Sequence, residues 1–504
     1  MLWFPTRSAQ RLPRLPQVRL ALLLLTAGAA WAAQTVSLPG PVVNPAAFAL
    51  LANSRYSVVS GFLPDLPEQV LANTVWAMDR APRLGERLEL YVATPENVYI
   101  YEPVERALRL HLPGDRRYNS GSAFEVGVAA ELHEDAGSAV QAGLLAATAF
   151  REEFGAAACP MSWVADHANA TWEPGSEVLM GIVFGRAEVR PPDTVLAVRS
   201  TDPELADPVI AGPDSFEIVL MGLRQDTAFA AWELSRETVS QLLWAGAGPT
   251  PHRTINNRPG LTIPDGFAGY PHTTGLWLVR RAGVSRYLVR PPVSGVRPPA
   301  PASHALEQNS ELDRRNDLRA ATGVTAPAYF VVTMPDTGDW RSRQEAGVVG
   351  FQLLVQARAL GLAGRLVGPL ERAEQQVVAR ALELPPGLVP VLVFAAGEAL
   401  GDAAVVADVP QPGAVEIVRA RPVLRRGERI RVEYLLRVPG PVRVEVFDML
   451  GRPVRQLPET RQTAGYHSAE WDGTSADGRR VKPGSYIIGV FGPGAVAQHK
   501  LSVL

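Results

Sequence analysis

Two stretches of the sequence decide the fold: AGSAVQAGLLAATAF (Ala136–Phe150) and AGVVGFQLLVQARALGL (Ala346–Leu362). Both open with Ala-Gly, are long enough for a helix, contain no proline and carry apolar residues on nearly every face. A helix that is apolar all round is buried in the core. We therefore expect two central buried helices, one in each half of the chain.

The segments that precede these stretches follow the same order in both halves. An amphipathic helix is expected at Leu66–Pro82 and again at Ser235–Gly248. Each is followed by a strand, at Glu96–Pro103 and at Ala282–Val289. The recurrence of one order indicates a tandem repeat of an α+β unit. The spacing between corresponding residues grows along the chain, which fits insertions in the second copy.

Proline-rich stretches divide the chain of 504 residues, a length that suggests about three domains of ~150 residues each. Residues 190–213 are predicted to be an interdomain linker, 290–303 an exposed loop inside the second unit, and 410–414 a break. The resulting units are 41–189, 214–409 and 415–504.

The N-terminus has the pattern of a secretory signal peptide. Four arginines precede an apolar run from Leu20 to Ala30, and Ala30-Trp31-Ala32 offers a small-x-small cleavage site. The alternative is a membrane anchor, but about a dozen apolar residues are too few for the ~20 that span a bilayer. We expect residues 1–32 to be removed, no stable membrane span afterwards, and an exported protein of the periplasm, the cell surface or the medium.

Composition excludes several classes of function. The chain has 49 Lys+Arg against 51 Asp+Glu, a balance that gives no reason to expect a nucleic-acid partner. Lys482 and Lys500 are the two lysines, so a phosphate-loop or Schiff-base lysine is excluded before residue 482. The single cysteine, Cys159, excludes an intrachain disulfide and a cysteine-based zinc site. The eight histidines are scattered, and no metal site is expected.

The last block is predicted to be a small β-sandwich. Alternating apolar and polar residues indicate strands at Ile430–Val438 and Val442–Phe447, and a further strand is expected at Gly484–Val490. Gly/Asp turn signals separate these short strands, as in sandwich domains.

At specific motifs this block resembles the FlgD Ig-like domain and, equally, the C-terminal sorting domain of type IX secretion cargo. The matching pieces are VEVFDMLGRPVRQL (Val444–Leu457), AGYHSAEWDG (Ala464–Gly473), DGRRVKPGSYI (Asp477–Ile487) and the closing HKLSVL. The first resemblance implies a structural or docking module. The second implies an address that is recognised by secretion machinery.

The order of elements over residues 41–405 resembles the nitroreductase family, most closely its SagB-type dehydrogenase branch. The motifs that carry the resemblance are RYSVVSGF (Arg55–Phe62) and RQDTAF (Arg224–Phe229), the Trp-Ala pairs at 76–77 and 244–245, RPGLTIPDGFAGYP (Arg258–Pro271) and the two Ala-Gly helices.

The resemblance implies an α+β fold in which two nitroreductase-like units form an intrachain pseudo-dimer, followed by the Ig-like sandwich. Members of the family are usually intertwined homodimers with FMN at the subunit interface. In a fused chain, the two central helices would supply that interface within one polypeptide.

The resemblance also implies the FMN-binding residues. These would be Arg55, Ser57, Gln141, Arg224, Pro264, Asp265, Gly266 and Gln352. The chain departs from the family where Tyr56 and Gln225 replace a second arginine and Asp265 replaces a serine. Fewer guanidinium groups weaken phosphate binding, since charge-assisted hydrogen bonds contribute ~1.5–3 kcal/mol each.

Two functional hypotheses follow. The first is an exported FMN-dependent oxidoreductase of nitroreductase type, which acts on a small-molecule redox substrate. The second is a non-catalytic secreted or surface protein that keeps the fold for binding and is delivered by its C-terminal domain. No catalytic residue can be assigned from the sequence.

Overall fold

The computed structural model describes residues 35–44, 46–187, 198–210, 212, 214–253, 259–264, 272–290 and 302–399, and in the C-terminal block 415–420, 423–424, 429–436, 440–448, 453–458, 460–463, 465–476, 478–492 and 495–503. The predicted signal peptide at 1–32, most of the proline-rich stretch at 290–303, and the predicted site residues Asp265 and Gly266 lie outside the described residues.

The first lobe is a seven-stranded sheet in the order β1-β4-β3-β2-β5-β7-β6. Its strands are β1 Thr35–Ser37, β2 Leu88–Ala93, β3 Asn97–Glu102, β4 Ala107–Pro113, β5 Phe124–Ala130, β6 Ala156–Pro160 and β7 Val178–Arg186. Its helices are α2 Phe48–Ser54, α3 Glu68–Asp79, α4 His133–Ala149, α5 Arg151–Phe154 and α6 Ser162–Thr171. Helices α3 and α4 pack on one face of the sheet, and α6 packs on the other.

The second lobe has a seven-stranded sheet in the order β8-β13-β12-β11-β14-β16-β15. Its strands are β8 Arg199–Ser200, β11 Gly275–Arg280, β12 Gly283–Arg290, β13 Ser303–Ser310, β14 Ala328–Pro335, β15 Ala363–Val367 and β16 Leu388–Gly397, beside the pair β9 Pro249–Arg253 and β10 Pro259–Leu261. Its helices are α7 Phe216–Met221, α8 Arg236–Ala247, α10 Arg315–Thr322, α11 Trp340–Ala359 and α12 Arg372–Leu382. Helices α8 and α11 cover one face, and α10 and α12 the other.

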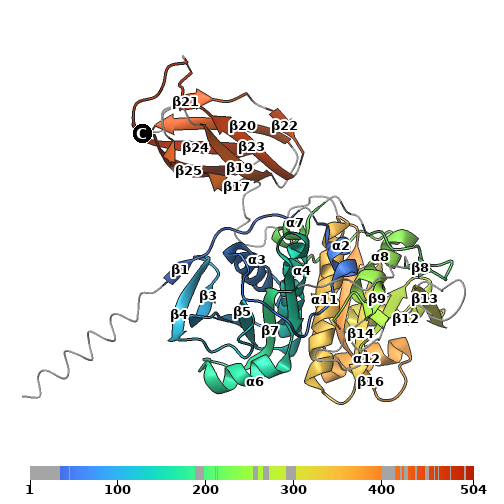
Figure 1. Ribbon diagram of the computed structural model, residues 1–504. Coiled ribbons are helices and arrows are strands. Elements are labelled where there is room, and N and C mark those ends of the chain that lie inside the picture. Colours follow the sequence, from blue (N-terminus) through green and yellow to red (C-terminus); the bar gives the residue numbers. More distant parts are fainter. Residues whose placement is uncertain are drawn as a thin grey trace, which may run out of the picture.

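The two lobes place corresponding strands at corresponding positions. When the first sheet is followed from β4 to β6 and the second from β13 to β15, each strand of one has a counterpart in the other. The edge strands differ in direction, since β1 is antiparallel to β4 and β8 is parallel to β13. The central helices also correspond, since α4 follows β5 and α11 follows β14 along the chain. Both helices are buried along almost their whole length, as the sequence predicts. They lie side by side at the centre of the two lobes (Figure 1).

Two glycines set the distance between α4 and α11. A Cβ at Gly137 would overlap the backbone carbonyl oxygen of Gln344, and a Cβ at Gly347 would overlap that of Glu134. The contact is reciprocal. Gly137 lies three residues after Glu134, which meets Gly347, and Gly347 lies three residues after Gln344, which meets Gly137. The Ser138 hydroxyl adds a hydrogen bond of 3.0 Å to the carbonyl oxygen of Gly347. One continuous hydrophobic core draws residues from both lobes around this crossing.

A buried carboxylate at the start of each central helix holds a loop of its own lobe. Asp135 accepts hydrogen bonds from the backbone N–H groups of Leu84 (2.8 Å) and Gly85 (2.9 Å). Glu345 accepts from the N–H groups of Thr274 (3.1 Å) and Thr273 (3.3 Å). Asp135 lies in the first turn of α4, where a carboxylate is also favoured by the helix dipole. Asp135 therefore joins α4 to the segment before β2, and Glu345 joins α11 to the segment before β11.

The described part of the predicted linker, residues 198–210, is packed against the second lobe rather than free of it. Strand β8 pairs in parallel with β13, and Leu205 is buried in the core. The Asp202 carboxylate accepts a hydrogen bond of 2.7 Å from the N–H of Leu306. The proline content indicated a break in regular structure, but it could not show that the segment extends a sheet.

The C-terminal block forms two sheets around a core of its own, as predicted (red in Figure 1). The strands are β17 Val415–Ala420, β18 Val423–Leu424, β19 Ile430–Leu436, β20 Gly440–Asp448, β21 Pro453–Gln456, β22 Thr460–Gln462, β23 Gly465–Trp471, β24 Gly484–Gly492 and β25 Ala495–Val503. Trp471 fills the core between the sheets, and its indole N–H donates to the Thr474 carbonyl at 2.8 Å.

Among the helices in the described part of the chain, none has the length and apolar character that a membrane crossing requires.

The helix crossing predicts a large effect of one methyl group. We expect Gly347→Ala to lower the free energy of unfolding by about 3 kcal/mol or more, because its Cβ meets backbone that cannot move without separating the helices. Gly350→Ala on the same helix is the matched control. Its Cβ would meet only the side-chain ends of Leu366 and Leu392, so a change within about 1 kcal/mol is expected. Urea denaturation of both variants checks the difference, and equal stabilities would contradict the proposed role of the crossing.

Candidate functional site at the lobe interface

Arg55 of the first lobe reaches into the second lobe. It follows α2 directly, and its side chain is buried. Its guanidinium donates hydrogen bonds to three backbone carbonyls, those of Leu261 (3.2 Å), Thr262 (3.4 Å) and Ile263 (2.9 Å). A buried cation that meets several carbonyl dipoles is well compensated. Arg55 therefore holds the segment 261–263 of the second lobe against the first.

The two central helices meet the same segment from the other side. Gln141 on α4 donates from Nε2 to the Thr262 carbonyl oxygen at 3.4 Å, and Gln352 on α11 donates to the same oxygen at 2.8 Å. Both glutamines are fully buried, and in the described structure neither Oε1 atom has a hydrogen-bond partner. One carbonyl is thus the meeting point of three side chains from two lobes.

The segment 261–263 is also fixed within its own lobe. The Thr262 N–H donates to the Gly248 carbonyl at 2.9 Å, and the Thr262 hydroxyl donates to the Trp244 carbonyl at 3.3 Å. Thr262 and Ile263 are both buried. The backbone here is bonded on both sides, which gives the interface site a defined shape.

The structure brings together half of the residues that the sequence assigned to a flavin site. Arg55, Gln141 and Gln352 converge on Thr262, and buried Pro264 follows Ile263 along the chain.

The remaining predicted residues do not join this cluster. Ser57 is half-buried, and no hydrogen bond of its side chain is found within the described ranges. Arg224 is 56 % exposed in its side chain and pairs with Asp226 at 3.1 Å. Asp265 and Gly266 are not described. Arg55 and Arg224 therefore occupy different environments despite their corresponding places in the sequence.

A nucleophilic role for the single cysteine is disfavoured at this site. Cys159 lies on β6 and is buried. Burial raises the pKa of its thiol to about 12, and the nearby Arg55 offsets this only in part. A thiolate is the reactive form of cysteine. The thiol therefore stays protonated at neutral pH and acts as a small apolar group.

As arranged, the cluster does not fit the phosphate of FMN. A phosphate needs donors that point at it, whereas the Arg55 guanidinium points at three carbonyl oxygens. Those oxygens carry partial negative charge and would repel an anion placed among them. Binding would require the segment 261–263 to move out of its hydrogen bonds to Arg55.

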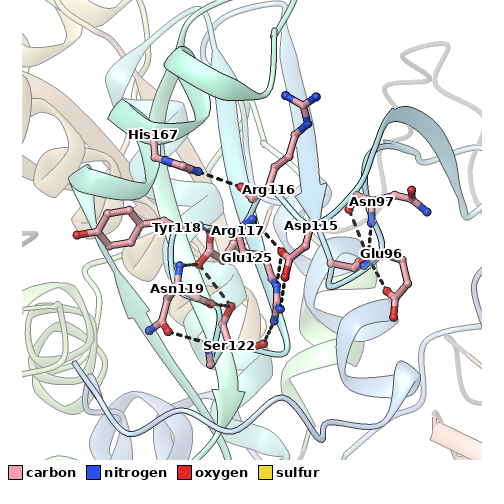
Figure 2. A network of polar contacts seen from close by, with 12 residues as sticks. Glu96, Asn97, Asp115, Arg116, Arg117, Tyr118, Asn119, Ser122, Glu125 and His167 are labelled. Carbon is pink, nitrogen blue, oxygen red and sulfur yellow. Dashed lines mark hydrogen bonds and ion pairs between the residues drawn. The ribbon is translucent and has the colours of Figure 1, made fainter.

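A second polar cluster lies in the first lobe and was missed by the sequence analysis (Figure 2). The Glu125 carboxylate on β5 accepts hydrogen bonds from the N–H groups of Tyr118 (2.8 Å) and Asn119 (2.7 Å). Arg117 pairs with Asp115 at 2.7 Å and donates to the Ser122 carbonyl. Burial raises the pKa of Glu125 to about 7, although these hydrogen bonds act to lower it. An acid within an otherwise apolar strand was the signal that could have found it.

Comparison with known proteins supports the assignment of two regions. Residues 228–398 carry a domain that matches the nitroreductase family, and residues 423–492 match the FlgD Ig-like domain. The first lobe lies outside both matches. No curated protein matches the chain.

Several solved structures resemble parts of the chain at low identity. A candidate nitroreductase from Anabaena variabilis is 13% identical, with 68% of this chain and 93% of that chain covered and a TM-score of 0.49. A candidate nitroreductase from Ralstonia eutropha is 21% identical, with 42% and 97% covered and a TM-score of 0.31. An FMN-dependent nitroreductase from Clostridium difficile is 12% identical, with 38% and 91% covered and a TM-score of 0.25.

The different environments of Arg55 and Arg224 predict unequal effects of one substitution. Arg55→Met keeps apolar volume but leaves buried carbonyls without donors, at a cost of ~1–3 kcal/mol for each unsatisfied group. We expect Arg55→Met to lower the free energy of unfolding by about 3 kcal/mol or more. Arg224→Met changes an exposed side chain and should alter it by less than ~0.5 kcal/mol. Chemical denaturation measures both, and a tolerated Arg55→Met would show that the three carbonyl contacts contribute little.

Proposed function

We propose that the two lobes are fused units of nitroreductase type and form a pseudo-dimer within one chain. The correspondence of strand positions in the two sheets supports this proposal. So does the reciprocal contact of Gly137 and Gly347, because an interface of two related units places the same residue of each unit against the other.

On this basis we propose that the chain uses a nitroreductase-type fold for binding, without flavin chemistry at the Arg55 site. One observation carries the proposal: the side chains of Arg55, Gln141 and Gln352 donate their hydrogen bonds to backbone carbonyls of residues 261–263. The donors that would hold a cofactor instead join the two lobes. The site thereby contributes to the stability of the interface.

An FMN-dependent oxidoreductase that acts on a small redox substrate is the second candidate function. Two observations favour it: the nitroreductase domain at 228–398, and the buried Oε1 atoms of Gln141 and Gln352, which have no partner in the described structure. Unsatisfied buried polar atoms are uncommon and sometimes mark a missing ligand. These amide oxygens could accept hydrogen bonds from a ring N–H group.

Flavin content separates the two candidates. Mature protein purified from its native host should show no visible flavin absorbance, because the Arg55 guanidinium is held by three backbone carbonyls rather than directed at a phosphate. When the protein is incubated with excess FMN and then ultrafiltered, the flavin should pass into the filtrate and none should stay with the retained protein. Co-purification of flavin at one or more equivalents per chain would overturn the first candidate and support the second. In that case the flavin content of Arg55→Met and Arg224→Met would show which arginine holds the phosphate.

We further propose that the protein is exported and that the C-terminal block directs it to its final location. The arginine-bearing, acid-free start with its short apolar run supports export. The separate core of the C-terminal sheets supports an independently folded module, since its apolar residues pack among themselves. Secretion machinery is the partner that this proposal implies.

Truncation of residues 415–504 in the native host tests the sorting role. The core that the two lobes share contains no residue of this block, so the truncated protein should fold and accumulate in the periplasm. The full-length protein should instead reach the surface or the medium. Cell fractionation followed by immunoblotting measures both distributions. If the two forms distribute identically, the block is a structural or docking module rather than an address.

A further inference from the structure

A pocket of about 260 Å³ opens beside β14 in the second lobe, away from the Arg55 cluster. Phe229 and Pro327 form part of its apolar wall, and Arg315, Asn316 and Arg319 of α10 form its polar wall. Small-molecule sites combine apolar walls with a few polar groups that fix orientation. The volume suits a small organic molecule rather than a single ion.

One of the two arginines in this pocket has a free guanidinium. The Arg315 guanidinium donates from Nε and Nη2 to the Asp313 carboxylate, at 2.9 and 2.8 Å, and from Nη1 to the Glu233 carboxylate, at 3.3 Å. Arg319 lies one turn further along α10, and among the described residues its guanidinium has neither an ion-pair partner nor a hydrogen-bond partner. Arg319 is therefore the guanidinium of this pocket that remains available to a ligand.

The first lobe shows what occupies the corresponding place there. Asp115 and Arg117 pair through the same atoms as Asp313 and Arg315 do. The second residue of β5 is Glu125, whose buried carboxylate fills the space beside Arg117 (Figure 2). The first lobe thus supplies its own carboxylate at this point.

The second lobe replaces that carboxylate with a phenol. The second residue of β14 is Tyr329, which lines the pocket. Burial raises the pKa of its hydroxyl, and the hydrogen bond from the Ala326 N–H and the nearby charges of Arg315 and Arg319 offset this only in part. The preceding connection, residues 311–327, is longer than its counterpart at 114–123 and contains α10. The longer connection therefore adds Arg319 to the wall of the pocket, while Tyr329 takes the strand position that Glu125 has in the first lobe.

Exposed apolar side chains adjoin the pocket in the sequence. Trp232 is 65 % exposed and follows the lining residue Ala231, and Leu312 is 57 % exposed and precedes Asp313. Within the pocket itself, the apolar wall of Phe229 and Pro327 together with the charged groups suits a ligand with a polar end and an apolar body.

We propose that this pocket binds the carboxylate of a small ligand that carries an aromatic or branched apolar group. Arg319 and Asn316 bind the carboxylate, and the wall formed by Phe229 and Pro327 receives the apolar group. A monoanion is favoured over a phosphate dianion, because the pocket offers one free cation and contains the Asp313 carboxylate. The proposal rests on the proposed binding function for its biological role and deepens it by naming the class of ligand.

Titration with 3-phenylpropionate tests the charge requirement, with the neutral amide 3-phenylpropionamide as the matched probe. Isothermal calorimetry on the mature full-length chain at neutral pH should show one site for the acid. The amide should bind at least about tenfold more weakly, as expected for loss of a charge-assisted hydrogen bond. Equal binding of acid and amide, or no binding of the acid at millimolar concentration, would overturn the proposal.

Arg319→Gln tests the location of the site. Arg319 is exposed, so the variant should unfold at the same denaturant concentration as the wild type while its affinity for the acid falls about tenfold or more. Arg87→Gln removes an exposed arginine of the first lobe and should leave the affinity unchanged. Undiminished binding by Arg319→Gln would place the acid elsewhere. Flavin content is read separately, so failure of this proposal and failure of the flavin-free function are distinguishable.

Discussion

The close approach of α4 and α11 is the constraint on which the rest of the structure depends. Gly137 and Gly347 allow backbone to meet backbone at the crossing, and larger residues at either position would force the helices apart. The common core, the meeting of Gln141 and Gln352 at Thr262, and the reach of Arg55 into the second lobe all require this spacing. Since interiors are close-packed, a shift of the helices would be transmitted to each of these contacts.

Local patterns made much of the fold predictable. The central helices follow from apolar residues on every face, and the strands of the C-terminal block follow from their alternation and turns. The part played by residues 198–210 was not predictable in this way, because the pairing of β8 with β13 depends on residues about a hundred positions apart. Periodicity reports which side of an element is buried, and it does not report its neighbour in a sheet.

Four of the eight residues that the sequence assigned to a flavin site lie together, but the hydrogen bonds that they make could not be predicted from the sequence. Arg55, Gln141 and Gln352 converge, yet their common partner is a backbone carbonyl, and a backbone group leaves no mark in the residue types of a sequence. The same limit explains why Arg224 was grouped with Arg55, since each arginine opens one of the two matching motifs. Burial separates them, and burial depends on the opposite lobe.

Because the two lobes belong to one chain, substitutions at the interface occur singly. In a homodimer every substitution appears on both sides of the symmetry axis, so a single mutation changes the interface at two places. Here Ser138 bonds to the Gly347 carbonyl, while the corresponding position after Gly347 is a valine that makes no such bond. The association of the lobes also does not weaken on dilution, since it is intramolecular. Covalent connection thus frees each lobe to acquire features that the other lacks, such as the carboxylate of Glu125 on one side and α10 on the other.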